Sequence, residues 1–399
     1  MSEWPLVPIG ELCELYDGPH QTAPLAPGGP VVYLNVGDIR GGRIELALSG
    51  QVTEETARKW SRRVEPLPGD VVFGYEAKVG EAAMLTKDHR WCLGRRVGLL
   101  RPRSGLIDSR YLTYAWYSKH FQDTLRAHRI GGTTIESIRL TDLPRWTIPL
   151  PSIDRQRRIA GTLGALDDKI ELNRRMSETL EGTAQALFKS WFLDSEPDAS
   201  DEDGSLADAV DLLRDLVDPQ LEPDTVFHHY SLPAYDAGRE AISEPGAGIR
   251  SSKLAVPWGS VLLSKLNPEI ERVWVPDIRP DDRAICSTEF LVLRPRADVG
   301  RAFVYEFLRS APFRSTLTSL VTGTTGSHQR AHAEAILQVP LRLPGPSQAA
   351  KFELVVGLML DRVAVARRES RTLVALRDAL LPRLLSGETS PSFGGGQGA

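Results

Sequence analysis

The sequence predicts an α+β protein made of two similar domains, each followed by a long helix. Two observations support this fold class. Short motifs recur in the same order at an offset of about 190 to 193 residues, and each set is followed by a stretch with apolar residues at heptad spacing. The length of 399 residues is sufficient for two domains of ordinary size.

The internal repeat is carried by five matches in register. The matching positions are 68–73 and 257–262, 100–103 and 293–296, 111–116 and 303–308, Phe121 and Phe313, and the Gly-Thr-Thr motifs at 132–134 and 323–325. Runs of β-branched and aromatic residues predict short strands that precede one helical stretch in each copy. We expect these strands at 31–36, 71–73 and 98–100 in the first copy, and at 261–263, 273–275 and 290–293 in the second.

The long helices follow Pro-rich segments at 148–151 and 341–344. Their predicted seam positions are Ile159, Leu163, Leu166, Ile170, Asn173, Ser177, Leu180, Ala184, Leu187 and Trp191, then Phe352, Val356, Met359, Val363, Ala366, Ser370, Leu373, Arg377, Leu380 and Leu384. A helix of about 40 residues is about 60 Å long, too long for one compact domain to bury. We therefore predict an antiparallel coiled coil with pseudo-two-fold symmetry, and keep a head-to-tail stack as the alternative.

These patterns predict six segments along the chain. They are a first domain at 1–151, a spacer helix at 152–193, an acidic linker at 194–224, a second domain at 225–344, a second spacer helix at 345–387, and a disordered tail at 388–399. A short helix is expected at 207–217 within the linker. Pro382 is expected to end or kink the second long helix. Asn173 on the seam either sets the helix register or is a tolerated polar residue.

Charge is distributed unevenly along the chain. The net charge is −4, but the segment 194–224 holds twelve acidic residues and a single basic one, Arg214. The remaining residues carry 47 basic and 40 acidic side chains, an excess of about seven positive charges. Such a body can approach a phosphate backbone, although a surplus this small is common among proteins.

Several classes of site and location are not supported by the sequence. Cys13, Cys92 and Cys286 are too far apart for a paired-cysteine metal motif, and we interpret them as buried small apolar residues. The chain has neither a phosphate-binding Gly-rich loop nor a His-Glu-x-x-His motif, and His328 and His332 have no third ligand nearby. We predict no catalytic centre and no metal site. The absence of a long apolar run or signal peptide predicts a cytoplasmic protein without membrane contact.

Several of these motifs together resemble the specificity subunits of type I restriction-modification enzymes. They are Gly-Thr-Thr at 132–134, Ile-Pro-Leu-Pro-Ser-Ile-Asp-Arg-Gln-Arg-Arg-Ile-Ala at 148–160, and Leu-Asp-Asp-Lys-Ile at 166–170. The segments 4–12, 261–268 and 380–388 are also similar to that family. The chain departs from the family pattern at the start of the second helix, Pro-Ser-Gln-Ala-Ala-Lys, and in the short stretch of about 30 residues between Val226 and Pro257.

The resemblance implies a non-catalytic subunit that recognises double-stranded DNA. Each target-recognition domain would recognise one half of a split sequence, and the helix pair would fix the unread gap between the halves. Two methyltransferase (modification) subunits would dock on the helices, and motor-nuclease (restriction) subunits would join for cleavage. The chain itself would hold no cofactor, because S-adenosylmethionine belongs to the methyltransferase partner, and ATP and magnesium belong to the motor-nuclease partner.

Cationic, amide and hydroxyl side chains are the candidates for DNA contact, because phosphates and base edges accept hydrogen bonds from them. The predicted DNA-binding residues are Lys78, Arg95, Arg96, Arg129, Thr133, Thr134, Lys265, Asn267, Arg272, Thr324, Thr325, His328 and Arg330. The predicted partner-binding residues are Arg174, Arg175, Arg367 and Arg368, with a solvated helix flank as the alternative. Two other functions stay open: a coiled-coil scaffold without DNA binding, and the DNA-recognition chain of a methylation-only or other phage-defence complex.

Overall fold

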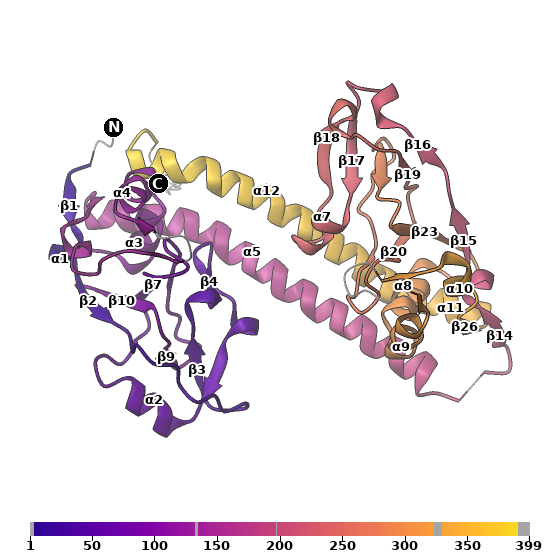
Figure 1. Cartoon of the computed structure of the whole chain (residues 1–399), viewed down its shortest axis with the longest axis horizontal. Coiled ribbons are helices and arrows are strands. Elements are labelled where there is room, and N and C mark those ends of the chain that lie inside the picture. The colour runs from indigo at the N-terminus through magenta and orange to yellow at the C-terminus, as the bar shows by residue number, and fades with distance from the viewer. Residues whose placement is uncertain (1–3, 132–134, 197, 323–328, 390–399) are drawn as a thin grey trace, which may run out of the picture. The chain divides into compact units, whose positions relative to one another are not determined.

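The computed structural model describes residues 4–131, 135–196, 198–322 and 329–389. The chain divides into two compact units (Figure 1). Unit 1 consists of residues 1–171 and 370–399, and unit 2 consists of residues 172–369. Each unit therefore contains one globular domain and a part of both long helices.

The domain of unit 1 is built on a four-stranded antiparallel sheet in the order β2-β10-β7-β8. These strands are β2 (Cys13–Asp17), β10 (Val97–Pro102), β7 (Val71–Gly74) and β8 (Ala82–Met84). A second sheet has the order β6-β3-β9, formed by β6 (Gly50–Val52), β3 (Val31–Leu34) and β9 (Trp91–Leu93). The expected strands at 31–36, 71–73 and 98–100 are confirmed as β3, β7 and β10.

Helices and short pairs of strands complete unit 1. They are α1 (Ile9–Leu12), α2 (Glu54–Trp60), α3 (Ser109–Trp116), α4 (Lys119–Ala127), and the antiparallel pairs β1 (Leu6–Pro8) with β13 (Thr147–Pro149), β4 (Ile39–Arg40) with β5 (Arg43–Ile44), and β11 (Ile130–Gly131) with β12 (Glu136–Ser137). Asp108 begins α3 by accepting a hydrogen bond from the backbone N–H of Tyr111 at 2.9 Å. The Trp116 and Phe121 rings, with centroids 4.5 Å apart, join α3 to α4 in the core.

Unit 2 repeats this topology. Its four-stranded sheet has the order β15-β23-β20-β21, formed by β15 (Val210–Leu213), β23 (Phe290–Pro295), β20 (Val261–Ser264) and β21 (Val273–Trp274). Its second sheet has the order β16-β19-β22-β17-β18, formed by β16 (Leu216–Val217), β19 (Lys253–Ala255), β22 (Ala284–Cys286), β17 (Val226–Tyr230) and β18 (Ile242–Pro245). The pairing of β17 with β22 is parallel, as is that of β3 with β9. The internal repeat is therefore a duplicated fold.

Unit 2 contains five further short helices and two further strand pairs among the described residues. They are α6 (Leu206–Ala209), α7 (Leu232–Asp236), α8 (Arg301–Arg309), α9 (Ala311–Ser319), α10 (Ala333–Leu337), and the antiparallel pairs β14 (Glu202–Ser205) with β26 (Pro340–Leu343) and β24 (Val321–Thr322) with β25 (Arg330–Ala331). The helices α8 and α9 correspond to α3 and α4.

The prediction of an acidic linker at 194–224 is wrong from Glu202 onward. This segment forms β14, α6, β15 and β16, and only residues 207–209 of the expected helix at 207–217 are helical, as the end of α6. Leu206, Ala209 and Val210 are buried in the core of unit 2, while Asp208 between them is exposed. The many acidic residues of this segment made its few buried apolar positions difficult to recognise in the sequence. The second domain therefore begins before Val226.

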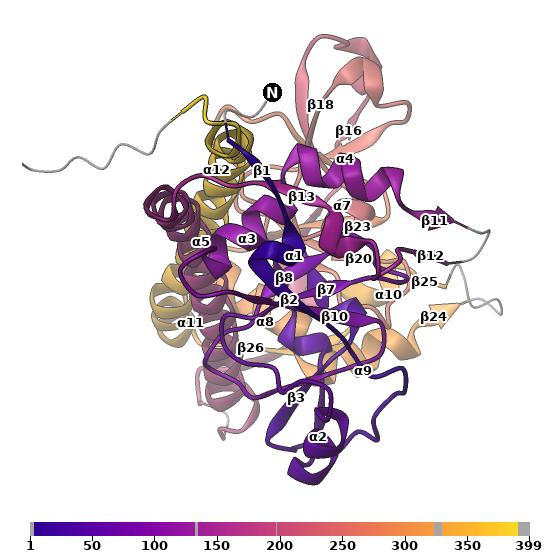
Figure 2. The same ribbon diagram turned by 90° about the vertical axis from the view of Figure 1, so that its left-hand side faces the viewer.

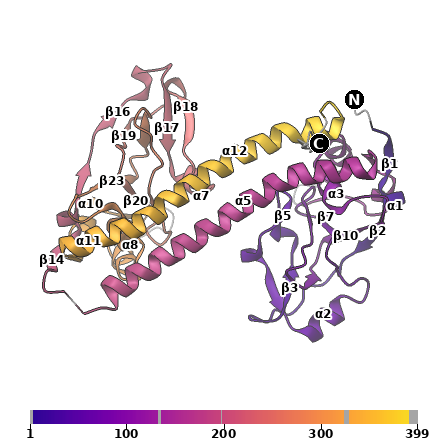
Figure 3. The same ribbon diagram turned by 180° about the vertical axis from the view of Figure 1, so that it is seen from behind.

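The two long helices run in opposite directions within each unit (Figure 3). The first is α5 (Ile153–Phe188), which continues as a π-helical turn at Lys189–Leu193. The second consists of α11 (Pro346–Phe352), a π-helical turn at Glu353–Gly357, and α12 (Leu358–Ser386). In unit 1 an early residue of α5, Asp167, pairs with a late residue of α12, Arg377. In unit 2 the late part of α5 pairs with the early part of α12. The predicted fold class with antiparallel long helices is confirmed.

The predicted heptad seam is buried at most of its positions. The fully buried members are Ile159, Leu163, Ile170, Asn173, Ser177, Ala184, Phe352, Val356, Val363, Ala366 and Leu384. Of the two outcomes expected at Pro382, an end or a kink, the first does not occur, because α12 continues to Ser386. Leu384 and Leu385, beyond this proline, are buried in the core of unit 1. Their burial favours the last helical turn despite the missing N–H of the proline.

Asn173 connects the two helices of unit 2 through its side-chain amide. The Nδ2 atom donates to the backbone oxygen of Ala366 at 3.3 Å and to Oε2 of Glu369 at 2.9 Å. Because one of these bonds involves a charged group, we expect Asn173→Ala to lower the free energy of unfolding by about 1–2 kcal/mol. Urea unfolding of the full chain measures this loss. The exposed variant Glu178→Ala is the control on the same helix, and an equal effect of both variants would contradict a specific role of Asn173.

Candidate nucleic-acid interface

Three loops that are far apart in the sequence meet at one end of the unit 1 sheet. Backbone hydrogen bonds join them: Tyr75 N–H donates to Arg96 O at 3.3 Å, Ala77 N–H to Glu136 O at 2.9 Å, and Ile138 N–H to Tyr75 O at 2.9 Å. The loops are the β7–β8 turn, the β9–β10 turn and the β11–β12 pair. We call this group the loop platform of unit 1. It carries the predicted residues Lys78, Arg95, Arg96 and Arg129.

Unit 2 has the same loop platform at equivalent positions. Lys265 N–H donates to Glu289 O at 2.9 Å, Asn267 N–H to Gln329 O at 2.9 Å, and Ala331 N–H to Lys265 O at 3.1 Å. Each donor and acceptor lies 190 to 193 residues after its counterpart in unit 1. The platform is therefore a property of the duplicated fold and does not depend on individual side chains.

The turn between β7 and β8 in unit 1, and the equivalent turn between β20 and β21 in unit 2, each contain a residue with a left-handed backbone conformation. The φ angle is +68° at Ala77 and +48° at the equivalent Asn267. Asparagine tolerates this conformation better than most residues with a Cβ atom, so the turn itself accounts for its presence at position 267. The Oδ1 atom of Asn267 is buried and makes no hydrogen bond to any residue in the described part of the chain.

The unit 1 platform has two paired arginines and two exposed cations. Arg96 Nε lies 3.0 Å from Glu76 Oε1, and Arg129 Nη1 donates to Glu136 Oε2 at 2.9 Å. Both arginines are half-buried, so carboxylates hold their guanidinium groups in place. Lys78 and Arg95 are exposed, and their side chains form no hydrogen bond or ion pair within residues 4–131, 135–196, 198–322 and 329–389.

The unit 2 platform places its charges differently. Arg330 donates to both carboxylate oxygens of Glu289, with distances of 2.7 and 3.0 Å, so a glutamate occupies the position of Arg96 in unit 1. Lys265 is half-buried beside this pair. Arg272 is buried, and its Nε and Nη2 atoms each bind a carboxylate oxygen of Asp236 at 2.8 Å. These bonds hold the pKa of Asp236 below its ordinary value and give Arg272 a role inside the domain.

Five of the predicted DNA-binding residues lie outside the described residues. They are Thr133, Thr134, Thr324, Thr325 and His328. The strands on either side of them, β11 with β12 and β24 with β25, belong to the two loop platforms (Figure 2). Along the sequence, both Gly-Thr-Thr motifs therefore adjoin strands of the platforms.

Two arginines at the platforms were missed by the sequence analysis. Arg139 is exposed and directly follows Ile138. Arg314 on α9 donates to the backbone oxygens of Glu269 and Ile270, and so lies against the loop that carries Asn267. Proximity to the Gly-Thr-Thr motif was a signal for Arg139. No sequence signal pointed to Arg314, because only the fold brings α9 to this loop.

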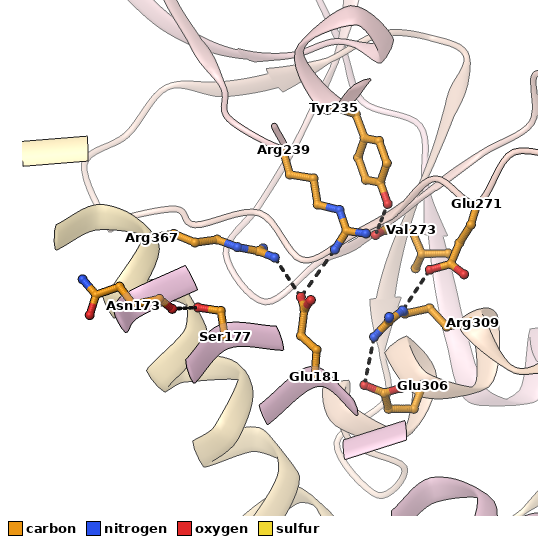
Figure 4. Close-up of polar contacts among 10 residues, drawn as sticks. All are labelled: Asn173, Ser177, Glu181, Tyr235, Arg239, Glu271, Val273, Glu306, Arg309 and Arg367. Atoms are coloured by element: carbon orange, nitrogen blue, oxygen red, sulfur yellow. Dashed lines mark hydrogen bonds and ion pairs between the residues drawn. The ribbon is translucent and has the colours of Figure 1, made fainter. Parts of the chain in front are cut away.

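The predicted partner-binding arginines of the helices differ in exposure. Arg367 Nη2 donates to Glu181 Oε1 at 2.8 Å (Figure 4), and Arg368 pairs with Asp277 of the same unit. Arg174 and Arg175 are exposed, and Arg174 Nη1 donates to Glu178 Oε1 at 2.6 Å. The side chains of Arg367 and Arg368 are thus used within unit 2, whereas Arg174 and Arg175 point their charge to the surface.

The described residues show little that suggests catalysis. Cys13, Cys92 and Cys286 are buried free thiols, as expected, and burial raises the pKa of Cys92 to about 11 and that of Cys286 to about 12. Such thiols are poor nucleophiles. No group of three potential metal-binding side chains occurs among residues that the structure describes. Within the same residues, no helix combines the length and hydropathy of a membrane span.

Comparisons with known proteins agree with this architecture. A solved structure of a type I restriction-modification S subunit from M. genitalium matches with a TM-score of 0.64, covering 98% of this chain and 97% of that protein at 17% identity. The MjaIX specificity subunit of Methanocaldococcus jannaschii is 28% identical over 205 residues, or 50% of this chain, and the HindI specificity subunit of Haemophilus influenzae is 26% identical over 172 residues, or 42% of this chain.

These sequence matches span less than half of the relatives' own length, 46% for the Methanocaldococcus protein and 36% for the Haemophilus protein. Residues 1–182, which include the whole unit 1 domain and the first part of α5, match the family described as the type I restriction modification DNA specificity domain. Through these residues, the chain is similar to the specificity subunits of type I restriction-modification enzymes.

Proposed function

We propose that this chain is the non-catalytic DNA-recognition subunit of a type I restriction-modification complex. Each unit recognises one half of a split DNA target, and the helix pair keeps the two halves at a fixed separation. The observation that carries the proposal is the duplicated loop platform. The same backbone hydrogen bonds recur in both units, but the charged side chains on them differ, as expected for two domains that recognise different sequences with one framework.

The side chains on the platforms can bind both the phosphates and the base edges of DNA. Exposed Lys78 and Arg95 offer positive charge to phosphates, and the forked guanidinium groups of Arg129 and Arg330 match the acceptor pair of a guanine. Glu136 and Glu289 hold these two guanidinium groups in the absence of DNA. An arginine held in this way loses less conformational entropy on binding, since its side chain is already ordered. The Gly-Thr-Thr motifs, which adjoin the platform strands along the sequence, supply further hydroxyl groups for contact with DNA.

The long helices provide a surface for the methyltransferase subunits. Large apolar side chains are exposed along them, namely Leu172, Leu354, Leu358, Val365 and Leu376. Exposed apolar residues on a helix flank favour burial by a partner. We propose that two methyltransferase subunits cover these side chains, and that Arg174 and Arg175 contribute to the contact. S-adenosylmethionine binds on those subunits, ATP and magnesium bind on the motor-nuclease subunits, and the complex acts in the cytoplasm.

The proposal is tested by co-expressing the chain with the methyltransferase encoded beside it and mapping methylated adenines across the host genome. We expect methylation confined to one split motif, two short specified halves around a fixed gap. Replacing Thr133 and Thr134, or Thr324 and Thr325, with alanine weakens one half of the motif at a time. If a stable complex forms without a split motif, or no complex forms, a scaffold without DNA recognition is the better account.

A further inference from the structure

Each unit contains a carboxylate of α5 that binds the globular domain and α12 at the same time. In unit 1 this carboxylate is Asp167. The hydroxyl of Tyr114 on α3 donates to its Oδ2 atom at 2.6 Å, and Arg377 on α12 donates to its Oδ1 atom at 2.9 Å. Asp167 therefore links three elements of the unit: α5, on which it lies, α3 and α12.

In unit 2 the corresponding carboxylate is Glu181 (Figure 4). Its Oε1 atom accepts a hydrogen bond from Arg367 on α12 at 2.8 Å, and from Arg239, which follows α7 of the globular domain, at 3.4 Å. The guanidinium group of Arg239 also lies over the ring of Tyr235, 5.1 Å from its centroid. We call these two groups of contacts, around Asp167 and around Glu181, the three-way junctions.

Both junctions are shielded from water. The side chains of Asp167 and Glu181 are 21% and 16% exposed, whereas the neighbouring Asp168, which pairs with Arg110, is 68% exposed. Shielded ion pairs and charged hydrogen bonds are stronger than those at an open surface. They are also directional, unlike the apolar contacts of the helix seam. The junctions can therefore restrict the angle at which a globular domain is held on the helices, in addition to the apolar packing of domain and helices.

We propose that Asp167 and Glu181 are positioning residues that hold each recognition domain in one orientation on the helix pair, and thereby restrict the protein to a single length of the unread gap. This inference rests on the proposed function. Looser junctions let a recognition domain tilt on the helices, so that half-sites one base pair closer or farther apart become acceptable. Looser junctions would change the gap length that the protein accepts, while the DNA sequence recognised in each half-site would stay the same.

Each junction has two sets of contacts: the domain arm joins the α5 carboxylate to the globular domain, and the helix arm joins it to α12. The test breaks one arm at a time in the complex with the methyltransferase. Tyr114→Phe and Arg239→Gln break the arm to the globular domain, while Arg377→Gln and Arg367→Gln break the arm to α12 and leave the domain attached to α5. Each complex methylates plasmids that carry the target with its natural gap, or with the gap changed by one base pair in either direction. The ratio of methylation at altered gaps to that at the natural gap is measured within one sample, so it does not depend on how much protein is folded.

We expect the domain-arm variants to raise this ratio about 5- to 10-fold, and Tyr114→Phe combined with Arg239→Gln to raise it further. The helix-arm variants should keep the ratio of the unmodified protein, even where they lower its melting temperature. An unchanged ratio in the domain-arm variants, or an equal rise in the helix-arm variants, overturns the inference. If the unmodified complex methylates none of the plasmids, the proposed function fails, and this inference fails with it.

Discussion

Replacing Lys78 and Arg95 together with alanine is expected to weaken DNA binding by the methyltransferase complex about 10- to 100-fold at physiological salt. Both side chains are exposed on the unit 1 platform, so their loss leaves the fold intact. Each phosphate contact that is lost should also reduce the slope of log affinity against log salt by about one. Titrations of a labelled duplex carrying the target, at several salt concentrations, measure both quantities.

The matched control removes two exposed cations from the opposite end of the same sheet. Lys87 follows β8, which runs antiparallel to β7 and away from the platform, and Arg103 follows the far end of β10. The variant with Lys87→Ala and Arg103→Ala loses the same charge, so a general electrostatic effect would weaken binding equally in both. An equal loss, or no loss from Lys78 and Arg95, would remove the unit 1 platform from the DNA interface.

Glu306→Gln is expected to stabilise unit 2 by about 2 kcal/mol at pH 8 and to have little effect near pH 5. Glu306 is fully buried on α8, with one carboxylate oxygen 3.5 Å from Arg309 Nη1 (Figure 4) and the other without a hydrogen-bond partner in the described residues. Arg309 Nε in turn lies 3.0 Å from Glu271. Burial raises the pKa of Glu306 from its ordinary value of 4.5 to about 7; Arg309 opposes this rise, and Glu181 and Glu271 add to it.

The sign of the effect follows from proton binding. Between about pH 4.5 and 7 the folded chain keeps a proton on Glu306 that the unfolded chain has lost, so the free energy of unfolding falls as pH rises through this window. Glutamine has the same shape without the charge, and removes that dependence. Urea unfolding at pH 5 and pH 8 measures the change, with the exposed Glu269→Gln as control. An equal stability gain at both pH values would show that Glu306 is not protonated in the folded chain at pH 5.

Regular patterns in the sequence predicted most of the fold. The heptad positions predicted both long helices because the side chains of a helix pair must bury one stripe, whatever else surrounds them. The repeated motifs predicted two copies of one α+β domain, and the strands at 71–73 and 290–293 lie where they were expected. The start of the second domain was missed because acidic side chains outnumber the few buried apolar ones at Leu206, Ala209 and Val210.

Identifying the residues of the candidate site depended more on tertiary structure than predicting the fold did. The sequence by itself identified the Gly-Thr-Thr motifs and the cations near them, since these are local features. It did not distinguish Arg272, which is buried against Asp236, from Lys78, which is exposed, because both are single cations near a strand.

Only tertiary structure joined Tyr75, Arg96 and Glu136 into one platform, and only tertiary structure placed Asp167 and Glu181 between a globular domain and both helices. Helix periodicity and repeats are properties of neighbouring residues and are visible along the chain. Contacts between residues that are far apart in the sequence, such as Asp167 and Arg377, depend on the path of the backbone, which no local pattern specifies.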